Sequence, residues 1–199
     1  MSADSVVRYV DEPSLRILAE QASRAGADQR LDARLELYEQ VPSSGGASRK
    51  VEQLLTAALC EVYSEAYGRV LSFTKRPDVG GVVNYVNQTL GAAVERRNSQ
   101  LMSNWWRAVR SVLTTSNSEV YELNDDINGK PCLWQFAFLW FDKSTHRVLV
   151  VTCRARSRAV CIAGLESSDS SSESFSNAHS VHSSFGSDRD NSDHDSSAF

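Results

Sequence analysis

The sequence has few of the residues on which small catalytic or metal-binding domains rely. Its four cysteines stand far apart without a Cys-x-x-Cys pair, a spacing that does not predict a zinc site: Cys60, Cys132, Cys153 and Cys161. No stretch approaches the roughly 20 apolar residues of a membrane span. The first residues lack the basic start and apolar run of a secretory signal. We therefore expect an intracellular, soluble protein with reduced thiols and no contact with membranes.

Groups that could carry out catalysis are also scarce. Before the C-terminal tail the sequence has one histidine, His146, in a polar turn where side chains are usually solvated. The pair Gly80-Gly81 lacks the Lys-Ser/Thr partner of a phosphate-binding loop. Asp125 lies in turn-forming sequence, which favours a capping role, and Cys153 follows an apolar run, as inert core thiols do. We expect no enzymatic activity and no cofactor.

Charge is distributed unevenly along the chain. Residues 166–199 contain seven acidic residues and one arginine, a net charge of −6, whereas the whole chain is at −4. Serine supplies 14 of these 34 residues, and a segment so poor in aliphatic side chains cannot offset its ordering entropy. We predict one domain over residues 1–165 and a disordered tail over residues 166–199. A mildly basic body with an acidic tail does not indicate direct sequence-specific DNA binding.

Hydrophobic periodicity predicts most of the secondary structure. Apolar residues at helical spacing predict four helices, over residues 12–25, 51–63, 79–97 and 100–113. Alternation predicts a half-buried strand over residues 31–38, with Leu31, Ala33, Leu35 and Leu37 inward and Tyr38 outward, although its Glu and Arg residues leave a helix open. Three further strands are predicted over residues 119–123, 133–141 and 147–153, and residues 42–47 and 64–78 are interpreted as loops.

The last two strands should form a hairpin at the centre of the fold. Two sets of apolar side chains alternate along the first of them, namely Trp134, Phe136, Phe138 and Trp140 on one face, and Leu133, Ala137, Leu139 and Phe141 on the other. Because both faces are apolar, the hairpin should lie in a sheet that is covered on both sides. The pattern predicts a layered α+β domain, an antiparallel sheet packed between helices. We call Trp134, Phe136, Phe138 and Trp140 the aromatic row. Exposure of this row would instead favour an RNA-binding sheet.

The hairpin also carries a family resemblance. Its residues resemble the C-terminal signature block of the eukaryotic repressor of RNA polymerase III transcription, the Maf-type global repressor family, at Trp134, Phe136, Phe141, Lys143, Arg147, Val148, Cys153 and Arg154. Residues 77–94 resemble the family's helix with a Val-Val-Asn-x-Val-Asn core, which includes Asn84 and Asn87. Trp106 fits its Trp-x-Ala-Val helix. The resemblance spans about residues 15–157, with a short segment at 40–50 where the family has a phosphorylated insert and a divergent segment at 64–73.

The resemblance implies a repressor that works by binding. It implies an antiparallel sheet between helices, no cofactor, and docking on RNA polymerase III near its clamp, which blocks recruitment of the polymerase to initiation factors at promoters. The implied partners are RNA polymerase III, its initiation factors, protein kinases and phosphatases. The implied location is the nucleus, with shuttling to the cytoplasm controlled by phosphorylation. We expect a monomer.

Three sets of candidate site residues follow. The polymerase-binding candidates are basic, and the last three form a cluster whose alternative interpretation is a solvated strand end: Lys143, Arg147, Arg154, Arg156 and Arg158. The first phosphorylation candidate is Ser99, which ends an Arg-Arg-x-Ser sequence; the alternative interpretation of this sequence is a charged helix end. The other candidates are three tail serines that each have an acidic residue three positions later: Ser170, Ser187 and Ser192. The structural signature residues are Trp134, Phe136, Phe141, Cys153, Asn84 and Asn87.

Overall fold

The computed structural model of the chain describes residues 6–26, 28–42, 50–126 and 131–157. In these residues an antiparallel sheet has the strand order β1-β2-β6-β5-β4-β3. Its strands are β1 (Val7–Val10), β2 (Gln29–Gln40), β3 (Phe73–Arg76), β4 (Ser118–Leu123), β5 (Trp134–Asp142) and β6 (Arg147–Ser157). The helices are α1 (Pro13–Ala25), α2 (Val51–Val62), α3 (Val79–Val86), α4 (Ala92–Val94) and α5 (Leu101–Val112), with short helical turns at Ser64–Ala66, Asn87–Gly91 and Thr115–Asn117.

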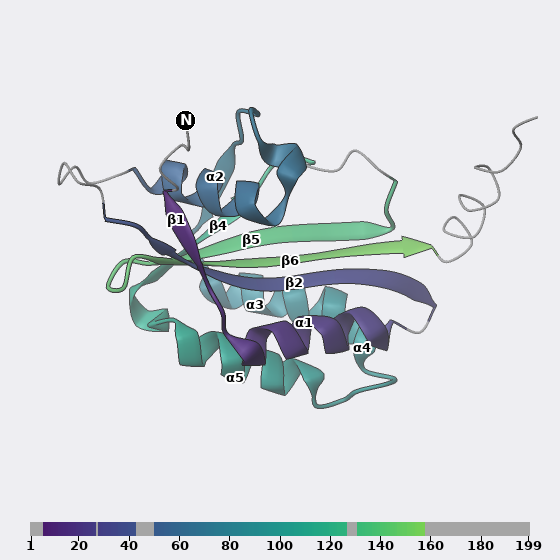
Figure 1. The fold of residues 1–199 in the computed structure, drawn as a ribbon. Coiled ribbons are helices and arrows are strands. Elements are labelled where there is room, and N and C mark those ends of the chain that lie inside the picture. Colours follow the sequence, from purple (N-terminus) through teal and green to yellow (C-terminus); the bar gives the residue numbers. More distant parts are fainter. Residues whose placement is uncertain (1–5, 27, 43–49, 127–130, 158–199) are drawn as a thin grey trace, which may run out of the picture.

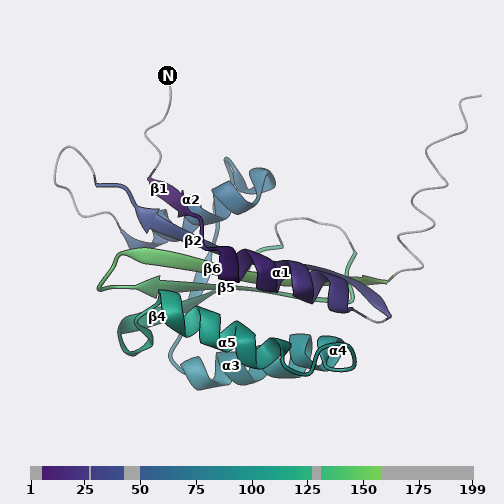
Figure 2. The ribbon, with the colours of Figure 1, turned by 60° about the horizontal axis from the view of Figure 1, so that its bottom comes forward.

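The helices divide between the two faces of the sheet. Helices α1, α3, α4 and α5 cover one face, and α2 lies on the other (Figures 1 and 2). Each predicted helix and strand is present, and residues 31–38 belong to a strand. The predicted α+β fold, an antiparallel sheet packed between helices, is therefore confirmed.

The β5–β6 hairpin separates two hydrophobic cores, as its two apolar faces predict. Phe136, Phe138 and Trp140 pack with α1, α3 and α5, whereas Leu139 and Phe141 pack with α2. The two cores contain the buried apolar side chains of the described residues. Burial of apolar surface stabilises a fold by about 25 cal/mol per Å². The hairpin therefore holds both helical layers.

A buried carboxylate fixes the turn of this hairpin. Asp142 accepts hydrogen bonds from the backbone N–H groups of Ser144 (2.8 Å), Thr145 (3.3 Å) and Thr114 (2.8 Å), and from the Ser144 hydroxyl (2.5 Å). Burial alone would raise the pKa of Asp142, but these hydrogen bonds outweigh it and hold that pKa well below its usual range. The carboxylate joins the turn to the segment that follows α5.

Two strands and one face differ from the predictions. Strands β1 and β3 lie at the two edges of the sheet, and with four residues each they are too short to show alternation. Tyr38, predicted to face outward, is buried because α2 covers this end of β2. Leu133 is 59% exposed, because it precedes β5 and lies beyond Ala137, Leu139 and Phe141, which pack in the core on the α2 side.

The helix predicted over residues 79–97 has an irregular middle. A π-helical turn at Asn87–Gly91 joins α3 to α4, which places Leu90 and Val94 in the core. None of the described helices has the length and apolar character needed to cross a bilayer. The predicted tail over residues 166–199, including Ser170, Ser187 and Ser192, lies outside the described residues, as do Arg158 and most of the loop at 42–47.

We predict that Phe136→Ala lowers the free energy of unfolding by about 3–5 kcal/mol, because it opens a cavity between the sheet and α3. The matched control is Leu133→Ala on the same strand pair, which removes an exposed side chain and should cost less than about 0.5 kcal/mol. Urea unfolding measures both values. Equal losses for the two variants would contradict the assignment of the aromatic row to the core.

Candidate functional site

The sheet face that carries α2 changes from apolar to polar along β6. Val148 and Val150 pack with α2, whereas Thr152, Arg154 and Arg156 follow at every second position on the same face. Helix α2 ends at Val62, and no described helix lies over the remainder of this face (Figure 1). Thr152 and Arg154 are buried and Arg156 is half-buried, so this polar half is free of described helices but only partly exposed.

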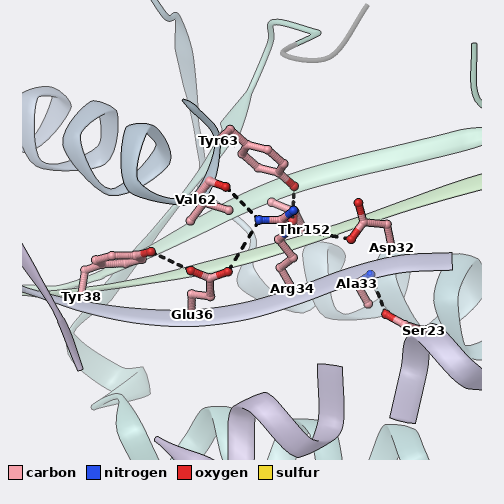
Figure 3. A network of polar contacts seen from close by, with 9 residues as sticks. All are labelled: Ser23, Asp32, Ala33, Arg34, Glu36, Tyr38, Val62, Tyr63 and Thr152. Atoms are coloured by element: carbon pink, nitrogen blue, oxygen red, sulfur yellow. Dashed lines mark hydrogen bonds and ion pairs between the residues drawn. The ribbon is translucent and has the colours of Figure 1, made fainter. Parts of the chain in front are cut away.

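Arg34 on β2 marks the boundary between the two halves (Figure 3). Its Nη1 donates a hydrogen bond of 2.8 Å to the Val62 carbonyl, one of the unpaired carbonyls at the end of α2. The guanidinium lies 4.9 Å from the ring centroid of Tyr63, and the Tyr63 hydroxyl is 2.7 Å from the Thr152 hydroxyl. Burial raises the pKa of Tyr63, so the phenol stays neutral in this network. Arg34 thus joins the end of α2 to the sheet.

Beyond this boundary the register brings arginines together. Arg30 on β2 lies directly opposite Arg156 on β6, and Asp32 lies opposite Arg154. Gln135 on β5 pairs with Arg154 from the other side. We call these residues, with Arg34, the arginine face: Arg30, Asp32, Arg34, Gln135, Arg154 and Arg156. These six residues have four cations and one carboxylate, a formal charge of +3. Arg34 is already paired, because it lies 3.6 Å from Asp32 and 3.9 Å from Glu36, the next residue of β2 on this face.

The arginines of this face differ in exposure. Arg154 is only 5% exposed, Arg156 is half-buried, and Arg30 is exposed. Within the part of the chain that the structure describes, neither Arg30 nor Arg156 has a carboxylate within 4.0 Å, and the buried Nε of Arg156 has no hydrogen-bond partner. Like charges directly opposite each other destabilise a sheet. An anionic group placed across Arg30 and Arg156 would relieve this repulsion.

The predicted polymerase-binding residues do not form one surface. Lys143 and Arg147 lie at the β5–β6 turn, whereas Arg156 lies nine residues further along β6, about 30 Å away at the rise of a strand. Arg147 starts β6 and Arg156 lies near its end, so the length of the strand separates Arg147 from the predicted cluster. The picture of a solvated strand end is wrong for Arg154, which is buried within the strand. Arg158 lies outside the described residues.

Lys143 and Arg147 are paired within the chain. The Nζ of Lys143 lies 2.6 Å from Glu119 Oε1, which also binds Lys75 Nζ at 2.5 Å. Arg147 lies 4.0 Å from Glu39. Hydrogen bonds from Lys143 and Lys75, with a further one from Tyr121, lower the pKa of Glu119 to about 2. Lys143 and Arg147 therefore each already have a carboxylate partner, although Glu119 is shared with Lys75 and Glu39 with Arg8.

The aromatic row does not form an RNA-binding platform. Phe136, Phe138 and Trp140 are buried beneath the helices, and Trp134 is half-buried with its ring stacked on Phe136 at a centroid distance of 6.2 Å. Bases could not stack on these rings without removal of α3 and α5. The alternative of an aromatic RNA-binding face is therefore excluded by their burial.

Of the other signature residues, Cys153 and Phe141 are buried, Asn87 contacts α5, and Asn84 is exposed. The side-chain oxygen of Asn87 accepts a hydrogen bond of 2.7 Å from the indole N–H of Trp106, which ties the π-helical turn to α5. Cys153 is buried, and burial raises the pKa of its thiol, as expected of an inert core cysteine. Phe141 is buried with its ring stacked on His146. Asn84 is exposed on α3.

The remaining candidates are accounted for by local structure. His146 is exposed in the hairpin turn, where its φ of 54° lies in the left-handed region. Asp125 accepts hydrogen bonds from the backbone N–H (2.7 Å) and hydroxyl of Ser72, and so caps the segment before β3. Ser99 is exposed between α4 and α5, at a hollow of about 660 Å³ that Asn87, Met102 and Trp106 also line. Its position is open to a kinase.

The sequence patterns left out Arg30 and Arg34, which the fold places beside Arg154 and Arg156. Alternation identifies Arg34 only as an outward residue of a strand, and Arg30 lies before the strand predicted over residues 31–38. The pairing of β2 with β6, which is not apparent from either strand alone, brings the two sets together. A cationic surface of this kind can attract an acidic partner, which is the property of a binding protein.

Comparison with known proteins agrees with this class. The model of the Maf1 regulator family matches residues 20–152, more than half of the chain. The chain therefore belongs to the Maf1 regulator family, and the resemblance to repressors of RNA polymerase III transcription is confirmed.

Solved structures support the same fold. Two crystal forms of citrus MAF1, in space groups P 31 2 1 and C 2 2 21, each superpose with a TM-score of 0.59 at 16% and 15% sequence identity. The match covers 73% and 72% of this chain and 99% of each citrus chain. At such low identity the likeness concerns the fold alone.

We predict that Glu119 contributes stability that depends on pH. Its folded-state pKa of about 2 lies below the roughly 4.3 of an unfolded glutamate. The charged form therefore stabilises the fold fully above about pH 4.3, and this contribution is lost as the pH falls through about 2. Glu119→Gln should be less stable than the wild type at pH 6, with a difference that shrinks towards pH 2. Thermal unfolding from pH 2 to 6 measures this, with Glu95→Gln as exposed control; a constant difference would refute it.

Proposed function

We propose that this Maf1-family chain represses transcription by binding RNA polymerase III itself and blocking recruitment of the polymerase to its initiation factors at promoters. Membership of a regulatory family supports a protein that acts by binding, without catalysis. The observation that carries the proposal is the arginine face, a cationic surface on a rigid sheet that is free of helical cover. Such a surface suits an acidic patch on a large protein partner.

The arginine face is the better of the two basic surfaces for this role. Lys143 and Arg147 each lie within 4.0 Å of a carboxylate, Glu119 and Glu39, so their release to a partner would break existing pairs. Arg30 and Arg156 lie directly opposite each other and, among the described residues, have no carboxylate within 4.0 Å. Arg154 contributes from below the surface, and Lys143, Arg147 and Arg158 are secondary contact candidates.

Phosphorylation is the proposed control. Ser99 is exposed, follows Arg96-Arg97-Asn98, and directly precedes Gln100 at the start of α5, which spans 12 residues. A phosphate there would add about −1.5 to −2 charges next to the arginines and the positive end of α5. We also propose that the protein acts in the nucleus and shuttles with the cytoplasm. Imaging of a fluorescent fusion before and after nutrient withdrawal tests this location.

Binding to purified RNA polymerase III tests the main proposal. Arg30→Gln/Arg156→Gln should weaken the affinity at least about tenfold, or ~1.4 kcal/mol, because it removes the two exposed charges of the arginine face. The salt dependence of binding should also flatten, since screening acts over about 8 Å at physiological ionic strength. Lys143→Gln/Arg147→Gln should have a smaller effect.

The matched control is Arg107→Gln/Arg110→Gln, which removes two exposed arginines from α5 on the opposite side of the sheet. Each variant is checked for an unchanged thermal midpoint before binding is compared. Equal affinities and equal salt slopes for the arginine-face variant and this control would refute the assigned surface. No polymerase binding by the wild type would refute the proposed mechanism.

We predict that a basophilic kinase phosphorylates the chain at Ser99 in vitro, because the serine is exposed beside two arginines. Ser99→Ala should lose most of the incorporated phosphate, whereas Ser103→Ala, four residues along α5, should keep it. Phosphopeptide mass spectrometry of the wild type and both variants measures the result. Incorporation that is unchanged in Ser99→Ala would contradict the assignment.

A further inference from the structure

The chain leaves the sheet beside the arginine face. Strand β6 ends at Ser157, one residue after Arg156, and Ser157 pairs with Gln29, the neighbour of Arg30. Whatever follows β6 in sequence therefore starts at the cationic half of the open sheet face, and at the end of the sheet opposite Lys143 and Arg147.

The sequence that follows has the complementary charge. Residues 166–199 have a net charge of −6, against +3 on the arginine face. Eight residues, 158–165, separate Ser157 from Glu166, and at about 3.5 Å each they reach up to roughly 28 Å. Glu166, Asp169 and Glu173, the first acids of the tail, can therefore reach Arg30 and Arg156.

We propose that residues 166–199 bind the arginine face of their own chain and compete there with external acidic partners. A short tether gives the tail a millimolar effective concentration, so even weak contacts suffice for occupancy. The acids of the tail supply the carboxylates that Arg30 and Arg156 do not find among the described residues. Competition with RNA polymerase III rests on the proposed function; occupancy of the face by the tail does not.

Phosphorylation of the tail would strengthen this contact. Each phosphate on Ser170, Ser187 or Ser192 adds about −1.5 to −2 charges and three strong acceptor oxygens, for which an arginine fork is a suitable partner. Ser170 is nearest the tether and should have the largest effect. A tail bound half of the time halves the affinity for a competitor, and one bound nine-tenths of the time lowers that affinity tenfold.

Nuclear magnetic resonance of the full chain tests occupancy directly. The comparison variant keeps the full length and changes the seven tail acids to amides, at Glu166, Asp169, Glu173, Asp188, Asp190, Asp193 and Asp195. At low salt, the Nε–Hε signals of Arg30 and Arg156 should differ between wild type and variant and converge in about 0.5 M salt. Signals of Arg107 and Arg110 on α5 should not change. Identical arginine-face signals in the two chains at low salt would overturn the proposal.

Two further measurements separate the alternatives. Signal differences that disappear on dilution would mean that the tail of a second copy occupies the face, which would overturn the intramolecular contact. In a polymerase-binding assay, the amide variant should bind about two- to tenfold more tightly than the wild type, and tail phosphorylation should weaken binding further. If neither chain binds the polymerase, the proposed function is wrong, while the resonance comparison still decides whether the tail docks.

Discussion

The change from valine to arginine along one face of β6 is the constraint on which the rest of the structure depends. Val148 and Val150 need an apolar cover, which α2 supplies; from Thr152 onward the strand presents groups that such a helix could not cover without burying unpaired charge. Arg34 closes the boundary by binding the last carbonyl of α2. The sequence of β6 thus determines both where α2 ends and which part of the sheet has no helix over it.

Basic residues at the two ends of the sheet differ in whether they have carboxylate partners, and this difference matters for function. At the hairpin turn, Glu119 binds both Lys75 and Lys143, and the edge strands are tied by further pairs such as Arg76 with Glu122. These charges blunt the edge of the sheet and keep it from pairing with other chains. At the other end, Arg30 and Arg156 are held in opposition by backbone register, so their cationic field is available to a partner. A Maf1-family protein that acts by binding would use the second kind of surface.

Much of the fold could be predicted from the sequence because the β5–β6 hairpin is apolar on both faces. Trp134 to Phe141 can be buried only between two layers, which leads to the α+β sandwich before any contact is known. The edge strands could not be predicted in this way, because β1 and β3 have four residues each and mostly exposed side chains. The outward prediction for Tyr38 is wrong for a related reason: alternation separates the two faces of a strand but does not reveal that both faces are covered.

The candidate site was less accessible from the sequence. Arg154 and Arg156 stand out because they follow an apolar run, but Arg30 precedes them by more than a hundred residues and gains meaning only from the β2–β6 register. Conversely, Lys143 and Arg147 share a sequence block with Arg154 and are separated from it by the length of a strand. Antiparallel pairing brings together residues that are distant in sequence, and a long strand separates residues that share one sequence block. The pattern of residue types alone reveals neither of these spatial relations.

Site-specific photocrosslinking tests most directly whether the arginine face is the surface that meets the polymerase. A photoreactive residue replaces Arg30 in one full chain and Arg110 of α5 in another, and each is irradiated with RNA polymerase III at physiological salt. Mass spectrometry then locates the linked peptides. The account predicts crosslinks from position 30 to acidic segments of a polymerase subunit and none from position 110. Crosslinks from position 110 with none from position 30 would contradict it.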